Sequence, residues 1–124
     1  MNVAIIIARK SSKRIKNKNI KKFNGKPIIK FAINNAKKTK IFDKIIVSTD
    51  SVKIANISKK YGAKIPFMRK KKFSKNNVST LNVIRDAIRN LNLNKKDYVC
   101  CIYPCTPLLN HNDIINGKRV LKKN

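Results

Sequence analysis

The sequence has almost no acidic residues. Its 124 residues include five Asp and no Glu, against 31 Lys and Arg, so the formal net charge is +26. Trp is absent and His occurs once. Divalent metal centres of the Mg²⁺ type need several oxygen ligands, commonly carboxylates. The scattered Asp residues offer no pair for such a centre, whereas the basic surface attracts anions.

The excess of Lys and Arg has two interpretations. A strongly basic chain is typical of nucleic-acid-binding proteins, so a small basic nucleic-acid-binding protein is one hypothesis. The other is codon bias, because Lys, Asn and Ile are abundant together and Lys is spread along the whole chain. Nucleic-acid modules usually present a groove-entering helix or stacking aromatics, and aromatic residues make up 6% here. We favour codon bias and expect no specific nucleic-acid partner.

Long apolar runs and paired cysteines are also missing. No run approaches the roughly 18 residues of a membrane span, so no membrane partner is expected. Residues 3–8 follow no basic region, which favours a buried strand over a secretory signal. Cys100, Cys101 and Cys105 form an odd, clustered set without the usual zinc spacing, which indicates reduced thiols. These features predict a cytoplasmic protein.

Apolar runs and helical patterns alternate along the chain. Strands are predicted at 3–8, 45–47 and 98–103, and helices at about 27–36, 51–61, 79–91 and 112–120. This order predicts one domain over residues 1–124, of the α/β class, with a mostly parallel sheet flanked by helices. Ligands of such sheets bind at the carboxyl ends of the strands. Three loops are expected to meet there, at 9–19, 49–50 and 103–107.

Three local expectations complete the predicted fold. Residues 9–23 are polar and without helical periodicity, which indicates a loop. Pro27 suits the first position of a helix. Asp50 or Ser51 is predicted to cap the second helix, with Val52 among the residues that face inward.

Several segments resemble one enzyme family, in the right order along the chain. They are A-R-K-S-S-K-R-I-K-N-K-N-I at 8–20, N-G-K-P-I-I at 24–29, V-S-T-D at 47–50, Y-G-A at 61–63 with Arg69, and Y-V-C-C-I-Y-P at 98–104. This pattern resembles the acylneuraminate and pseudaminic acid cytidylyltransferases, and the last segment is most similar to the pseudaminic acid branch. The resemblance implies a Rossmann-like nucleotide-diphospho-sugar transferase fold.

The resemblance also implies an activity. A cytidylyltransferase of this kind transfers CMP from CTP to a nonulosonic acid and releases pyrophosphate, for surface glycan or flagellin glycosylation. Pseudaminic acid is the favoured acceptor, with legionaminic or sialic acid as alternatives. CTP and an acidic nine-carbon sugar are therefore the expected partners, Mg²⁺ is the expected cofactor, and full-length members form homodimers.

Site residues follow by position. Arg9 and Lys18 are the cations expected to act on the phosphates during catalysis. The implied nucleotide-binding set is Ala8, Arg9, Ser12, Lys13, Lys18, Asn19, Arg69, Ser79 and Thr80. The implied sugar-binding set is Tyr103, Cys105 and Thr106.

The chain also departs from the family pattern. Lys10-Ser11 replaces a frequent Gly of the first loop, and Lys70 stands where Pro usually follows the Arg. Tyr103 replaces the Gln of many sialic acid members, which favours the other two branches. The family's metal-binding carboxylates lie beyond residue 124, so no metal ligand is expected within this chain except Asp50. We therefore expect the N-terminal part of an enzyme, truncated at its C-terminal side, with an inactive fragment as an alternative.

Overall fold

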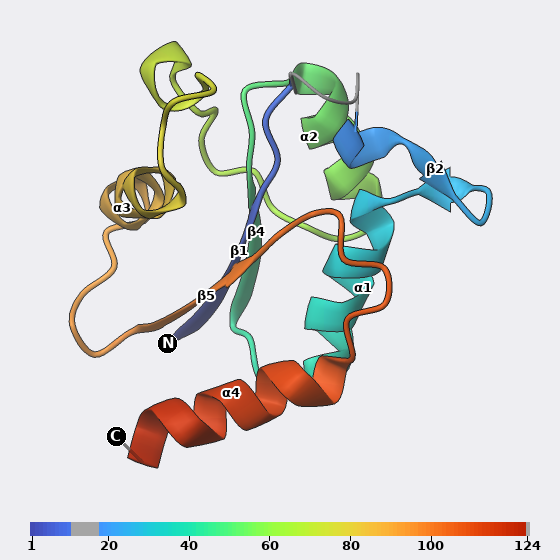
Figure 1. Ribbon diagram of the computed structural model, residues 1–124. Helices are drawn as coiled ribbons and strands as arrows, with labels where there is room; N and C mark the ends of the chain where they lie inside the picture. The colour runs from blue at the N-terminus through green and yellow to red at the C-terminus, as the bar shows by residue number, and fades with distance from the viewer. Residues whose placement is uncertain (11–17, 124) are drawn as a thin grey trace.

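The computed structural model describes residues 1–10 and 18–123 (Figure 1). In chain order the elements are β1 (Asn2–Ile7), the 3-10 helix η1 (Lys18–Ile20), β2 (Lys22–Phe23), β3 (Lys26–Pro27), α1 (Ile29–Thr39), β4 (Lys44–Ser48), α2 (Val52–Lys60), the 3-10 helix η2 (Lys71–Phe73), α3 (Thr80–Asn90), β5 (Tyr98–Ile102) and α4 (His111–Lys123).

The main sheet has the strand order β4-β1-β5, and both strand pairs are parallel. Ile5 of the central strand β1 lies opposite Ile46 on one side and Cys101 on the other. Residues 3–6 of β1 are completely buried. A continuous apolar run is what a parallel strand needs when helices cover both faces of its sheet. The predicted α/β class with a parallel sheet is confirmed.

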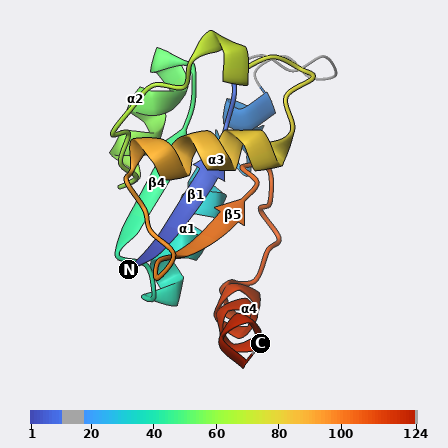
Figure 2. The ribbon, with the colours of Figure 1, turned by 90° about the vertical axis from the view of Figure 1, so that its left-hand side faces the viewer.

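Alternate residues of β1 point into two hydrophobic cores. Ala4 and Ile6 pack with α1 and α2, whereas Val3 and Ile5 pack with Ala87 of α3. Figure 2 shows α3 in front of the sheet and α1 behind it. This arrangement follows from the two-residue period of a strand, which sends successive side chains to opposite faces.

The segment before α1 corrects one expectation. Residues 22–27 form the small antiparallel hairpin β2-β3, in which Pro27 pairs with Lys22, so α1 begins at Ile29 and not at Pro27. Asn24 and Gly25 make its turn with φ values of 50° and 78°. Asn-Gly is the preferred pair for a two-residue hairpin turn because both positions need positive φ.

The start of α2 corrects another expectation. Ser51 caps this helix, since its Oγ accepts a hydrogen bond of 3.2 Å from the Ile54 backbone N–H. Val52 does not face inward but is 68% exposed. Asp50 does not cap the helix. It accepts a hydrogen bond from the Lys10 backbone N–H at 2.6 Å. This bond ties the first loop to the end of β4.

The last strand and the last helix leave a space between them. An apolar cavity of about 400 Å³, here called the β5–α4 groove, is lined by Asn2, Ile41, Phe42, Tyr98, Val99, Cys100, Cys101, Asp113, Ile114, Gly117, Lys118 and Leu121. In Figure 1, α4 runs below β5 with its first turns beside α1.

At 13 residues α4 is the longest helix of the described part, and no helix there combines the length and the apolar character of a membrane span.

Candidate functional site

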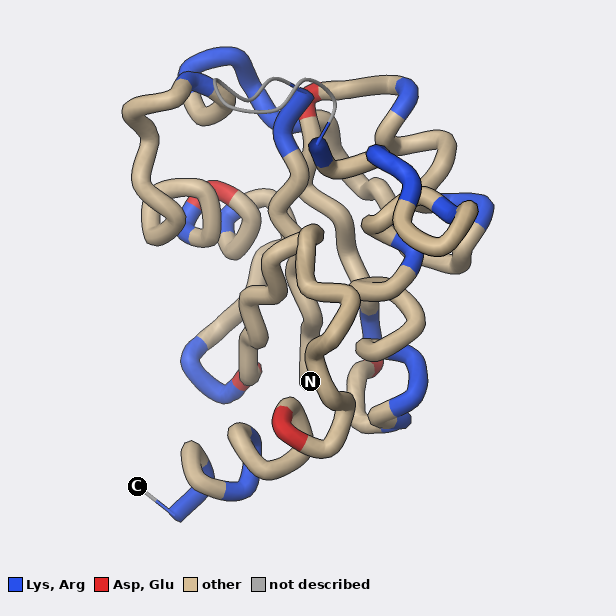
Figure 3. Tube along the Cα trace, turned by 45° about the vertical axis from the view of Figure 1, so that its right-hand side comes forward, with Lys and Arg blue, Asp and Glu red and all other residues tan. Residues whose placement is uncertain are grey.

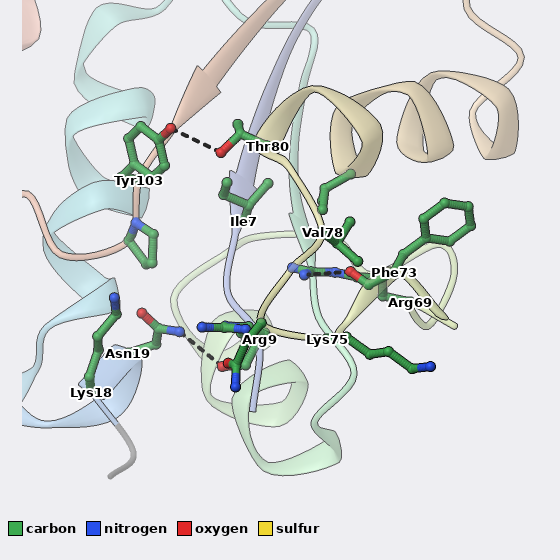
Figure 4. Close-up of a pocket in the computed structure, with 13 residues that line it drawn as sticks. Ile7, Arg9, Lys18, Asn19, Arg69, Phe73, Lys75, Val78, Thr80 and Tyr103 are labelled. Atoms are coloured by element: carbon green, nitrogen blue, oxygen red, sulfur yellow. Dashed lines mark hydrogen bonds between the residues drawn. The ribbon is translucent and has the colours of Figure 1, made fainter. Parts of the chain in front are cut away.

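A second cavity lies at the carboxyl ends of the strands, as the sequence predicts for a parallel sheet. This strand-end pocket has a volume of about 230 Å³ (Figure 4). Its lining comes from the end of β1, from η1, from residues 69–78, from α3 and from the turn after β5. The lining residues are Ile7, Arg9, Lys18, Asn19, Arg69, Phe73, Lys75, Asn76, Val78, Thr80, Val83, Tyr103 and Pro104.

The first loop brings two cations and an amide to this pocket. Arg9 lies two residues after the end of β1, and Lys18 and Asn19 belong to η1. Asn19 is 4% exposed, and its Nδ2 donates a hydrogen bond of 3.0 Å to the Arg9 carbonyl. Figure 4 shows the Asn19 amide nitrogen directed at that oxygen. Asn19 thus closes the first loop on itself and sets the spacing of Arg9 and Lys18.

Ala8 is not among the residues that line the pocket. It is completely buried, and its backbone N–H donates to the Ser48 carbonyl at 2.9 Å. This bond extends the pairing of β1 with β4 by one residue, which fixes the point where Arg9 leaves the sheet. Ser12 and Lys13, predicted to shape the phosphate loop, lie outside the described residues.

Arg69 is a buried cation, 6% exposed, in the pocket wall. Its Nε and one terminal nitrogen donate to the Oγ and the carbonyl of Ser48, at 3.1 and 2.6 Å. The other terminal nitrogen donates to the Phe73 carbonyl at 3.4 Å. Burial lowers the pKa of Arg69, and the carboxylate of Asp50 opposes this shift. Arg69 therefore joins the end of β4 to the loop that leads into α3.

Two hydroxyls bridge the pocket on its other side. Thr80 begins α3, Tyr103 follows β5, and their side-chain oxygens are 3.1 Å apart (Figure 4). Ser79, predicted beside Thr80, does not line the cavity: its Oγ accepts the Asn82 backbone N–H at 3.2 Å and caps α3. Helix capping satisfies a backbone donor that has no partner within the helix.

The turn after β5 orders the predicted sugar-binding residues. Tyr103 lines the pocket, whereas Cys105 and Thr106 lie outside its lining. The Thr106 hydroxyl donates to the Tyr103 carbonyl at 2.9 Å. The Cys105 thiol contacts Asn19 Oδ1 at 3.5 Å and the Lys18 carbonyl at 3.6 Å.

The described donors do not fit a magnesium ion. Asp50 is the carboxylate that follows β4, and one of its oxygens already accepts the Lys10 backbone N–H. Among residues 1–10 and 18–123, no three His, Cys, Asp or Glu side chains come together as a metal site would require. Mg²⁺ binds preferentially through one or two carboxylates together with phosphates and water. Asp50 alone, beside Arg69, supplies little of that set.

Sequence reasoning missed much of the pocket wall. The missed residues are Ile7, Phe73, Lys75, Asn76, Val78 and Val83, whereas Pro104 belongs to the loop 103–107 that the sequence predicts at this edge. Val83 is buried in the core and also lines the pocket. The helical periodicity of the sequence predicts that Val83 is buried, but it does not predict that it lines the pocket. Phe73 and Lys75 belong to a basic loop whose path depends on the Arg69 bonds. Lys and Arg are otherwise spread over the whole trace, as Figure 3 shows.

Comparison with known proteins consistently identifies one enzyme family. The cytidylyltransferase family model matches residues 3–124. The pseudaminic acid cytidylyltransferase of Campylobacter jejuni is 45% identical over 111 residues, which cover 88% of this chain and 48% of that protein. The CMP-N,N'-diacetyllegionaminic acid synthase of the same species is 42% identical over 83 residues, covering 67% of this chain and 35% of that protein.

A solved structure shares the fold. It is CMP:2-keto-3-deoxy-manno-octonic acid synthetase in complex with CTP, with a TM-score of 0.84 and 18% sequence identity. The match covers 99% of this chain and 48% of that one. The predicted nucleotidyltransferase fold is therefore confirmed. The chain spans about half the length of the pseudaminic acid cytidylyltransferase that it matches.

Proposed function

The chain belongs to the cytidylyltransferase family, and on that premise we propose that its strand-end pocket binds CTP. We assign the chain to the nucleotide-binding part of an enzyme that transfers CMP to a nonulosonic acid and releases pyrophosphate. Pseudaminic acid is the favoured acceptor because the C. jejuni relative that matches most of the chain carries that name. Legionaminic or sialic acid is the alternative acceptor.

The convergence of Arg9, Lys18 and Asn19 on one cavity is the observation that carries this proposal. In the reaction, the anomeric hydroxyl of the sugar attacks the α-phosphorus of CTP. Such transfers depend mainly on positioning and on neutralising the charge of the phosphates. Arg9 and Lys18 come from the two ends of one loop, so they can contact the triphosphate from two sides. Ser12 and Lys13 are assigned to the same loop.

The opposite wall suits the cytosine base. Arg69 and Thr80 line the pocket together with the apolar Val78 and Val83. Hydrophobic side chains with a few convergent polar groups are the usual composition of a small-molecule site. Ser79 supports this wall through its cap of α3, and Tyr103, Cys105 and Thr106 are assigned to the sugar side.

Other features stay predictions. Mg²⁺ as cofactor, a homodimeric full-length enzyme and a cytoplasmic location follow from family resemblance or from the cysteine pattern. No step above is routed through a metal ion. In enzymes of this kind, a bound metal neutralises phosphate charge.

Titration calorimetry with CTP, UTP, ATP and GTP at moderate salt tests the proposal. We expect CTP to bind more tightly than the purine nucleotides, because a pocket of about 230 Å³ selects by the size and the edge of the base. Equal affinity for all four nucleotides would contradict it and leave general attraction to a +26 chain.

Repeating the titration at several salt concentrations tests the nucleic-acid alternative. Non-specific nucleic-acid binding weakens steeply as salt rises, because it depends on counterion release. The preference for CTP over ATP and GTP is expected to persist at each salt concentration. A preference that disappears with salt, together with tight binding of mixed oligonucleotides, would favour the basic nucleic-acid-binding protein.

A further inference from the structure

The side chain of Asn19 contacts two other segments of the chain, the residues just after β1 and the turn after β5. Its Nδ2 donates to the Arg9 carbonyl at 3.0 Å, and its Oδ1 lies 3.5 Å from the Cys105 sulfur. These contacts connect residues that are 10 and 86 positions apart in the chain. Asn19 is 4% exposed, so its amide is almost completely shielded from solvent. One buried side chain thus joins the first loop to the turn after β5.

Hydrogen-bond chemistry allows one orientation of this amide. A carbonyl oxygen can only accept, so the Arg9 carbonyl needs the NH₂ side of Asn19. A thiol is a weak donor and a weak acceptor, and opposite the oxygen side of Asn19 the Cys105 thiol acts as the donor. The reverse orientation would place Asn19 Oδ1 against the Arg9 carbonyl, and two acceptors would face each other. The thiol and the carbonyl therefore fix the amide from opposite sides.

The Cys105 thiol must stay protonated in order to donate to the Asn19 side-chain oxygen. Burial raises the pKa of Cys105, and the charge of Lys18 opposes that shift. At neutral pH the sulfur is therefore protonated and can donate. Its second contact, 3.6 Å from the Lys18 carbonyl, is with another acceptor, so both neighbours favour the thiol over the thiolate.

We propose that Cys105 is a positioning residue, whose thiol orients the Asn19 amide and thereby sets Lys18, Asn19 and Arg9 in the strand-end pocket. An amide nitrogen carries two hydrogens, and the Arg9 carbonyl takes one. Asn19 lines the strand-end pocket, and we assign its second hydrogen to a ligand bound there. A ligand oxygen in the pocket, such as one of a phosphate, would receive it only in this orientation.

The effect on CTP rests on the proposed function, whereas the orientation of Asn19 does not. Two variants of the full 124-residue chain separate the donor from the volume of the side chain. Cys105→Ser keeps a donor, and Cys105→Val fills a similar space without one. Cys101→Val is the matched control, because Cys101 is an exposed residue of β5 that lines the β5–α4 groove.

The first readout uses no ligand. In ¹⁵N spectra, the side-chain amide signals of Asn19 are expected to shift in Cys105→Val, to return close to their original position in Cys105→Ser and to be unchanged in Cys101→Val. Unchanged Asn19 signals in a folded Cys105→Val chain would overturn the proposal. Should the valine variant fail to fold, Cys105→Ala, which creates no overpacking, gives the same comparison.

The second readout is nucleotide affinity by calorimetry. We expect Cys105→Val to weaken CTP binding by roughly three- to tenfold, the range for one net hydrogen bond, and Cys105→Ser to restore it. Full CTP affinity in a chain whose Asn19 signals have shifted would also overturn the positioning role. If the unmodified chain binds no CTP, the proposed function fails, and the Asn19 spectra alone then decide the role of Cys105.

Discussion

The two cavities of this protein differ in size and in chemistry. The β5–α4 groove is the larger, at about 400 Å³ against about 230 Å³ for the strand-end pocket. Yet its wall is mainly apolar, with Tyr98, Val99 and Leu121 among its lining residues. The strand-end pocket combines Arg9, Lys18 and other polar groups with a short apolar wall. Size alone would therefore favour the groove, whereas the chemistry of the lining favours the strand-end pocket.

The difference follows from the position of each cavity on the sheet. Parallel strands end in loops at one edge, so residues from distant parts of the chain meet there with polar side chains and free backbone groups. The groove instead runs along the side of β5, a strand at the sheet margin whose residues 98–101 are half-buried or exposed. Its lining is mainly apolar, with Asn2, Asp113 and Lys118 among its few polar members. The predictions below separate these two regions.

Loss of Arg69 should have the largest effect. Arg69→Met keeps an apolar stem but leaves the Ser48 Oγ and the Phe73 carbonyl without their Arg69 donor, while the Ser48 carbonyl keeps the Ala8 N–H. Buried acceptors left unsatisfied each cost about 1–3 kcal/mol, so we expect unfolding by urea to show a loss of ~2–4 kcal/mol. CTP binding should fall below detection in calorimetry, because the wall between β4 and α3 loses its link.

The control for Arg69 is Arg119, which is exposed on α4. Arg119→Met should change the free energy of unfolding by less than about 0.5 kcal/mol, as is usual for a surface substitution. Equal losses in the two variants would mean that the buried guanidinium does not hold the pocket together.

Loss of one pocket cation should have the next largest effect. Lys18→Ala removes a charge that we place against a phosphate, and charge-assisted contacts contribute more than neutral ones. CTP affinity measured by calorimetry should fall about tenfold, while unfolding by urea is nearly unchanged because Lys18 is exposed. Lys122→Ala, on the exposed end of α4, should leave CTP affinity within about twofold. Equal small losses would indicate that the +26 charge acts diffusely.

The polar edge could be predicted from the sequence because its residues directly follow strands. Arg9 follows β1, Tyr103 follows β5, and the rules for parallel sheets bring both to one edge. The family resemblance added Lys18 and Asn19, and the structure places both in the pocket wall.

Other features could not be predicted because local patterns suit two structures. Pro27 fits the first turn of a helix and also an edge strand, since both tolerate a missing N–H. Val52 is apolar, but the Ser51 cap sets the start of α2 and turns Val52 to the surface. Phe73 reaches the pocket because its carbonyl is bound by Arg69, a contact between loop residues that no periodicity reveals.

A change in the β5–α4 groove should have a small effect on the strand-end pocket. Leu121 is 55% exposed at the rim of the groove. Leu121→Asn should lower the free energy of unfolding by no more than about 0.5 kcal/mol, the usual size of a surface change. CTP affinity in calorimetry should be that of the unmodified chain. A tenfold loss, as expected for Lys18→Ala, would show that the two cavities are coupled and that our separation of them is wrong.

The smallest effect is expected at the amino edge of the sheet, opposite the pocket, and in acid alone. There the Met1 ammonium lies 2.6 Å from Asp97 Oδ1, and the Asn94 backbone N–H donates to Oδ2 at 2.9 Å. The ammonium contact and then the Asn94 bond lower the pKa of Asp97 below its ordinary value. A carboxylate with a lowered pKa in the folded state adds stability above its unfolded pKa, and that stability is lost as pH falls through the folded pKa.

Asp97→Asn in a chain with an unmodified amino terminus tests this prediction. Its free energy of unfolding should lie slightly below that of the parent chain at pH 6, and the difference should shrink as pH falls below about 4, where carboxylates begin to protonate. Urea unfolding of both chains between pH 2.5 and 6 measures the difference. Because the ion pair is remote from Arg9 and Lys18, CTP affinity at pH 6 should be equal in the two chains. A difference that widens toward low pH would contradict the assigned sign, and a loss of CTP affinity would show that the amino edge of the sheet influences the pocket at its carboxyl edge.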